Sequence, residues 1–108
     1  MNLQGKRALI TGGSSGIGFA IAEAMLAKGA QIVITGRRPD VLSTAAKRLR
    51  AGGRWVDFVA ADVSTEKGRE TTLKFALDKL GGLDVLVNNA GGVRPAGWRI
   101  QPKPRYGP

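Results

Sequence analysis

The apolar residues of this chain follow two alternating spacings, which predict strands and helices in turn. Short continuous apolar runs, rich in β-branched residues, are typical of buried strands. Between these runs, apolar residues recur every three or four positions, as expected for one face of a helix. The four predicted strands span residues 7–10, 31–35, 56–61 and 83–87.

Three helices are predicted between these strands, and each is followed by glycine, a common helix terminator. Pro39 is suited to open the second helix, and Ser64 or Thr65 to cap the third. The expected buried faces are Ile17, Ile21 and Met25 in the first helix, Leu42, Ala45, Ala46 and Leu49 in the second, and Leu73, Ala76, Leu77 and Leu80 in the third.

This alternation of strands and helices predicts an α/β fold with a doubly wound parallel sheet. We expect four strands in the order 3-2-1-4, with the first two helices on one face and the third on the other. In such sheets a ligand binds at the carboxyl ends of the strands. The residues that come directly after each predicted strand are therefore the candidate site.

The first strand is followed by a glycine-rich turn, residues 11–18, with the sequence TGGSSGIG. A helix that starts there offers unpaired N–H groups and the positive end of its dipole, which attract a phosphate. Gly12 is suited to a turn conformation that other residues resist, Gly16 to a close approach of the backbone, and Gly18 to tight packing of the helix on the sheet. The alternative is that these glycines only form a tight strand-to-helix turn.

The second strand ends in Gly36-Arg37-Arg38. An acid at the position of Gly36 would hold the ribose hydroxyls of NAD(H). Two arginines follow instead, and their forked donors suit a phosphate group. This arrangement favours NADP(H) over NAD(H), unless both arginines are ordinary surface residues before a helix.

The third and fourth strands end in Asp62-Val63 and in Asn88-Asn89-Ala90-Gly91. The Asp62 carboxylate could accept from an adenine amino group while Val63 packs on the ring. Ala90 and Gly91 leave room for a flat nucleoside. Taken one at a time, both sequences are also ordinary turn residues.

Together, these four strand ends resemble the cofactor half of the short-chain dehydrogenase/reductase family, over about residues 4–94. The resemblance implies a partial Rossmann-type fold, NAD(P)(H) binding and hydride transfer between a carbonyl and an alcohol. It also implies that Asn88 braces the central strands. The cofactor-binding residues that it implies are Gly12, Ser14, Ser15, Gly16, Ile17, Gly18, Arg37, Arg38, Asp62, Val63, Asn89, Ala90 and Gly91.

The chain departs from the family after Gly91. The family's catalytic Ser and Tyr-x-x-x-Lys lie well beyond that motif, and the only tyrosine here, Tyr106, has two residues after it. No catalytic residue is therefore assigned. We expect the NADP(H)-binding portion of an oxidoreductase, truncated before its catalytic residues and inactive alone. The alternative is a non-catalytic NADP(H)-binding module that acts with another chain.

Residues 1–93 are predicted to form the partial domain, and residues 94–108 an irregular tail that is rich in proline and arginine and has no acid. One explanation is a genuine flexible basic tail. The other is a shifted reading frame, because one extra base before the codon of Pro95 permits an acidic segment like the one that follows this motif in the family.

The composition and charge limit the kinds of partner that we expect for this chain. The net charge of +9 suits non-specific binding of nucleic acid, but no nucleic-acid motif is present, so no specific nucleic acid is expected. The sequence has no histidine or cysteine, which favours a reducing cytoplasm and no metal site. It contains no apolar run of about 20 residues, so no membrane span is expected. The apolar fourth strand predicts self-association through its exposed edge.

Overall fold

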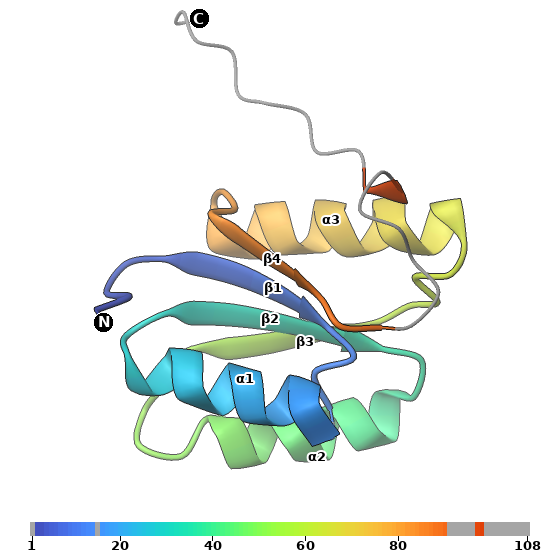
Figure 1. Cartoon of the computed structure of the whole chain (residues 1–108). Coiled ribbons are helices and arrows are strands. Elements are labelled where there is room, and N and C mark those ends of the chain that lie inside the picture. Colours follow the sequence, from blue (N-terminus) through green and yellow to red (C-terminus); the bar gives the residue numbers. More distant parts are fainter. Residues whose placement is uncertain (1, 15, 91–96, 99–108) are drawn as a thin grey trace, which may run out of the picture.

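The computed structural model describes residues 2–14, 16–90 and 97–98. It contains the predicted partial Rossmann fold, with four strands and three helices in the described part of the chain (Figure 1). Helices α1 and α2 cover one face of the sheet, and α3 covers the other. The elements in chain order are β1 (Arg7–Thr11), α1 (Gly16–Ala27), β2 (Gln31–Gly36), α2 (Pro39–Leu49), β3 (Val56–Ala60), α3 (Glu66–Leu80) and β4 (Val85–Asn88).

All four strands are parallel, and their order is β3-β2-β1-β4, which confirms the predicted topology. Thr11 lies opposite both Thr35 of β2 and Asn88 of β4. The carboxyl ends of these three strands are therefore level, and the turns after them meet at one edge of the sheet.

The core consists of two layers, because successive side chains of a strand point to opposite faces. Ala8, Ile10, Ile32 and Ile34 pack with α1 and α2. On the other face, Leu9 and Val33 pack with α3 and with Trp98. Trp98 is 7% exposed, so one residue of the predicted tail contributes to this second layer.

The predicted face is confirmed for α2, whose buried residues are Leu42, Ala45, Ala46 and Leu49. The expected face of α1 is correct in part: Ile21 and Met25 pack partly buried against the core, but Ile17 is 73% exposed. The buried residues of this helix are Gly18, Ala22 and Leu26. The reason is the close approach of α1 to the glycine-rich turn, where only the hydrogen of Gly18 fits beneath the helix.

One position of the α3 face was also wrong, because Leu77 is 38% exposed. A polar residue, Thr72, is buried in that face instead, and its hydroxyl donates to the carbonyl of Gly68 at 2.8 Å. Thr65 is the N-cap of this helix, accepting from the N–H of Gly68 at 3.0 Å, and Gly81 ends it with φ +78°. Both of these boundaries agree with the sequence signals.

Arg7 and Asp84 join the start of β1 to the segment before β4. The Nε of Arg7 lies 3.0 Å from Oδ2 of Asp84, which also accepts from the backbone N–H of Arg7 at 2.9 Å. These hydrogen bonds from Arg7 lower the pKa of Asp84 from 3.8 to about 2.

The ion pair should make stability depend on acid pH. Because the folded-state pKa of Asp84 is lowered, its contribution is complete above about pH 4 and is lost as the pH falls towards 2. We expect Asp84→Asn to lower the urea midpoint at pH 7 and to have little effect near pH 2. Asp78→Asn, an exposed change on α3, is the charge-matched control; equal midpoint losses at both pH values for Asp84→Asn would contradict the prediction.

Candidate functional site

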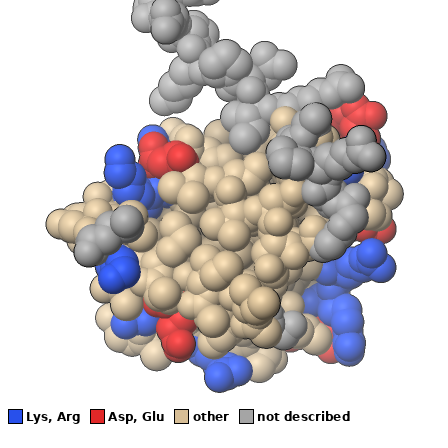
Figure 2. All heavy atoms as spheres, in the orientation of Figure 1, with Lys and Arg blue, Asp and Glu red and all other residues tan. Residues whose placement is uncertain are grey.

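A cleft of about 410 Å³ lies at the carboxyl edge of the sheet, where the prediction places the site. It collects residues that come after all four strands. Its lining is Gly12, Ser14, Thr35, Gly36, Arg37, Arg38, Val41, Ala61, Asp62, Val63, Ser64 and Ala90. In the face shown in Figure 2, basic side chains gather at the lower right, towards the end of the sheet where the strands finish in Figure 1.

A second cleft, of about 430 Å³, lies along α3 and is lined mainly by that helix. It contains none of the predicted site residues. We assign the candidate site to the strand-end cleft, because glycines, a carboxylate and guanidinium groups from separate strands converge there.

The glycine-rich turn is held tightly against the end of β4. Gly12 has φ +67°, and its N–H donates to the carbonyl of Thr35 at 2.9 Å. Its own carbonyl accepts from Nδ2 of Asn89 at 3.3 Å. A Cβ on Gly18 would overlap that same carbonyl oxygen of Gly12. Gly12 and Gly18 are thus required by geometry, through a turn conformation and a close approach.

Gly16 differs from these two glycines. It begins α1 with φ +58°, and a Cβ placed on it would meet no atom within 4 Å. Its role in this structure is conformational, and the space in front of it is open. The first turn of α1 has no acidic residue, so its positive end is not neutralised locally.

Two threonine hydroxyls, which sequence reasoning did not assign to the site, bind the strand ends together. The hydroxyl of Thr11 accepts from the N–H of Ala90 at 2.9 Å and donates to the carbonyl of Val87 at 3.4 Å. The hydroxyl of Thr35 donates to the carbonyl of Val59 at 2.8 Å. Both threonines are fully buried. The sequence signal that could have identified them is a threonine at the end of each of two apolar runs, Thr11 in β1 and Thr35 in β2.

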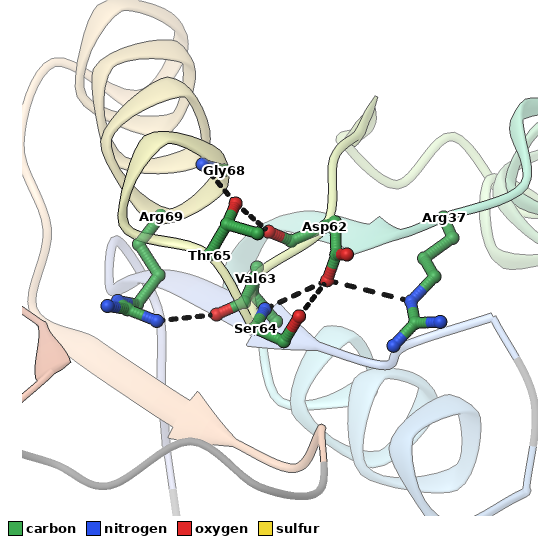
Figure 3. Close-up of polar contacts among 7 residues, drawn as sticks. All are labelled: Arg37, Asp62, Val63, Ser64, Thr65, Gly68 and Arg69. Atoms are coloured by element: carbon green, nitrogen blue, oxygen red, sulfur yellow. Dashed lines mark hydrogen bonds and ion pairs between the residues drawn. The ribbon is translucent and has the colours of Figure 1, made fainter.

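Arg37 and Asp62 form an ion pair across the cleft, at 3.6 Å between Nε and Oδ1 (Figure 3). The same oxygen of Asp62 accepts from the backbone N–H of Ser64 at 3.0 Å and from its hydroxyl at 2.6 Å. Chiefly these two bonds, with a smaller contribution from Arg37, lower the pKa of Asp62. The carboxylate therefore stays ionised, and Oδ2 takes part in none of these three contacts.

Arg38 is turned towards α2, where its Nη2 lies 3.4 Å from Oδ2 of Asp40. Arg37 and Arg38 each have 74% of their side chain exposed. Both can therefore be approached by a ligand, but only Arg37 is paired with a residue at the end of the next strand.

The structure brings most of the predicted residues to the cleft. Gly12, Ser14, Arg37, Arg38, Asp62, Val63 and Ala90 line it. Gly16, Ile17, Gly18 and Asn89 are not among its lining residues; the first three lie in the first turn of α1, and Asn89 follows β4. Ser15 and Gly91 lie outside the described residues.

Two other kinds of feature are missing from the described part of the chain. Within residues 2–14, 16–90 and 97–98, no three carboxylate or other metal-ligating side chains are grouped to hold a metal ion. None of the helices over these same residues is long and apolar enough to cross a membrane.

The fold and the strand-end cleft define a Rossmann-type α/β protein with a dinucleotide-binding arrangement. The family model described as short chain dehydrogenase matches residues 6–102. The chain therefore belongs to the short-chain dehydrogenase family of oxidoreductases, whose members bind NAD(P) cofactors.

Named relatives extend well beyond the matched region. A hydroxysteroid 11-beta-dehydrogenase 1-like protein of Macaca fascicularis is 42% identical over 102 residues, which are 93% of this chain and 35% of the relative. An NADP-dependent (R)-specific alcohol dehydrogenase of Lentilactobacillus kefiri is 43% identical, over 82% of this chain and 35% of its own length. The chain thus spans about a third of the curated relatives that it matches.

The solved structures agree with this assignment. The L-sorbose reductase of Gluconobacter frateurii, complexed with NADPH and L-sorbose, has a TM-score of 0.81 and 47% sequence identity to this chain. The match covers 84% of this chain and 35% of the reductase.

Proposed function

We propose that this chain is the NADP(H)-binding portion of a short-chain dehydrogenase/reductase that transfers hydride between a carbonyl and an alcohol. The observation that carries the choice of cofactor is the Arg37–Asp62 pair at the mouth of the cleft, with glycine at position 36. The guanidinium group would bind a 2′-phosphate, and Oδ2 of Asp62, which is not used in the contacts with Arg37 and Ser64, would accept from the adenine amino group. In support, one relative is named NADP-dependent and one neighbour was solved with NADPH.

The remaining residues fit the rest of a dinucleotide. The open space at Gly16 and the unneutralised start of α1 suit a pyrophosphate. Val63, 8% exposed in this structure, forms an apolar wall for the adenine ring, and Asn89 and Ala90 fix the nearby end of β4. Bound nicotinamide supplies hydride chemistry, and this chain's residues hold and orient the adenosine and phosphate groups.

Cofactor preference should be reversible by two substitutions. Arg37→Ala removes a charge-assisted hydrogen bond of about 1.5–3 kcal/mol, so NADPH should bind roughly 10- to 100-fold more weakly. Adding Gly36→Asp should favour NADH, and the change fits sterically because a Cβ there would come no nearer than 3.5 Å to Leu42. Fluorescence titration of both cofactors measures the switch. Arg54→Ala removes an exposed arginine before β3 and is the control; an unchanged NADPH:NADH ratio in the double variant would refute the assignment.

We further propose that the 108 residues have no turnover of their own, because they contain no Tyr-x-x-x-Lys pair. A positioned acid or base contributes typically about 10²–10⁴-fold to rate. Purified chain with NADPH and a panel of ketones should oxidise no more NADPH than a blank. Protein-dependent oxidation that survives a second purification would sink this proposal.

We propose a cytoplasmic location, because the composition is free of cysteine. We also propose that the partial domain ends at residue 93, with Trp98 of the following tail packed on its core. We also propose that the chain self-associates through the outer edge of β4, with a second copy as the partner. A binding module that acts with a different chain is the alternative, and measurement of the oligomeric state distinguishes the two.

A further inference from the structure

Arg69 connects two segments that are distant in the sequence. Its Nε donates to the carbonyl of Gly97 at 2.7 Å, and its Nη1 donates to the carbonyl of Val63 at 2.9 Å. Figure 3 shows the second contact, on the side of the Val63 turn away from Arg37. One planar guanidinium therefore holds the wall of the cofactor cleft and the segment that carries Trp98.

This position is unfavourable for a basic residue on general grounds. Arg69 lies close to the start of α3, which begins at Glu66, and the positive end of a helix dipole repels a cation. Two charge-assisted hydrogen bonds, each stronger than a neutral one, offset that repulsion. The geometry thus accounts for an arginine at this place, where a surface role alone does not.

Both carbonyls belong to segments that enter the same core layer. Val63 is 8% exposed and Trp98 is 7% exposed, and both belong to the hydrophobic cluster that contains Leu73 of α3. The N–H and hydroxyl of Ser64 and the hydroxyl of Thr65 donate to Asp62, and Thr65 accepts from Gly68 and Arg69. In the part of the chain that the structure describes, the Arg69 contact is what fixes the carbonyl of Val63.

We propose that Arg69 is a positioning residue that couples occupancy of the cofactor cleft to the docking of Trp98. A ligand that packs on Val63 favours the arrangement of the turn in which its carbonyl faces Arg69. The same guanidinium orientation fits the carbonyl of Gly97, so binding stabilises the docked Trp98. Because coupling is reciprocal, loosening Trp98 weakens ligand binding by the same factor. This inference rests on the proposed function, since it takes NADP(H) as the ligand.

The test uses the 108-residue chain with Trp55→Phe, which leaves Trp98 as the only tryptophan. Adding Arg69→Ala should shift Trp98 emission to longer wavelength and increase its quenching by acrylamide severalfold. The same variant should bind NADPH roughly tenfold more weakly, within the usual range of coupling between two sites. Arg69→Lys keeps the charge but has one ammonium group, which cannot replace the fork to two carbonyls, so it should give both changes too. Lys67→Ala, an exposed basic residue in the same helical turn, should give neither.

The outcomes separate this inference from the proposed function. Unchanged emission and quenching of Trp98 in both Arg69 variants would overturn the coupling, whatever the affinity for NADPH. A changed Trp98 signal with unchanged NADPH affinity would also overturn it, because the two segments would then be independent. If the parent chain does not bind NADPH, the proposed function fails, and the Trp98 signal still shows whether Arg69 holds the Gly97–Trp98 segment.

Discussion

Gly18→Ala is expected to lower the free energy of unfolding, although alanine is the better helix former. Helix propensity alone predicts a gain of about 1 kcal/mol for this change inside α1. The added methyl group, however, would overlap the carbonyl oxygen of Gly12 and lie 2.7 Å from Nδ2 of Asn89. Overpacking of this kind costs about 1–3 kcal/mol, and more where backbone has to move. We therefore expect a net loss of about 2 kcal/mol and at least tenfold weaker NADPH binding, because Gly12 belongs to the cleft.

The test of this prediction is whether Gly18→Ala lowers or raises the free energy of unfolding. Urea unfolding at pH 7 measures it, beside Ala24→Gly, which reports helix propensity at an exposed position of α1 and should cost about 1 kcal/mol. Gly16→Ala is a second comparison, in which strain from φ +58° acts without any overlap. A stabilised Gly18→Ala would show that propensity dominates and that the approach of α1 to Gly12 is not as tight as the structure indicates.

The helix ends and the order of the strands could be predicted from the sequence, because they depend on local signals and on the order of the elements. Pro39, Thr65 and Gly81 mark helix ends as expected, and the alternation of elements was sufficient for the sheet order. The inward face of α1 was not predictable from apolar spacing, since a step of four residues fits two neighbouring faces. Tertiary contact with the turn at Gly12 selected the face with the smallest residue.

The long-range side-chain contacts of the site could not be predicted from the sequence either. Gly36, Arg37 and Asp62 were assigned by their places after strands, but the ion pair between Arg37 and Asp62 depends on rotamers and on Ser64. The reach of Arg69 to Gly97 crosses 28 positions and has no sequence motif. The sequence thus predicts which residues follow a strand, but it does not predict which partner each of their side chains contacts.

The two edges of the sheet differ in a way that bears on assembly. On β3, the outward carbonyl of Val56 accepts from Nε of Arg50 at 2.9 Å, and the outward N–H of Phe58 donates to Asp57 at 2.8 Å. Side chains therefore occupy the groups that another strand would need. On β1, the carbonyl of Lys6 and the N–H of Gly12 face β2, so by alternation Leu9 faces β4. In the register of Leu9 with Leu86, the residues of β4 that bond Leu9 are Val85 and Val87, so the N–H of Leu86 points outwards. No strand in the described part of the chain pairs with that edge, and Val85, Leu86 and Val87 carry no charge to protect it.

We therefore expect the 108-residue chain to associate at micromolar concentration through β4, with self-association opposed by the net charge of +9. Salt screens that repulsion, since the Debye length falls from about 10 Å at 0.1 M to about 3 Å at 1 M, so association should increase with ionic strength. Sedimentation velocity at both salt concentrations measures the oligomeric state. In the assembly, the amide proton of Leu86, which points away from β1, should exchange slowly.

Leu86→Pro is the variant that isolates the edge. It removes an N–H that points away from β1, a position where proline is tolerated in an edge strand, and it should give a monomer with a smaller loss of stability than a proline that breaks the ladder. Val87→Pro is the matched control: it removes an N–H that faces β1, by the same alternation, and should destabilise the fold itself. A parent chain that stays monomeric in 1 M salt, with slow exchange at Leu86, would contradict the prediction. It would mean that the four-stranded half of the fold protects its own edge, so that the apolar character of β4 serves only the two core layers.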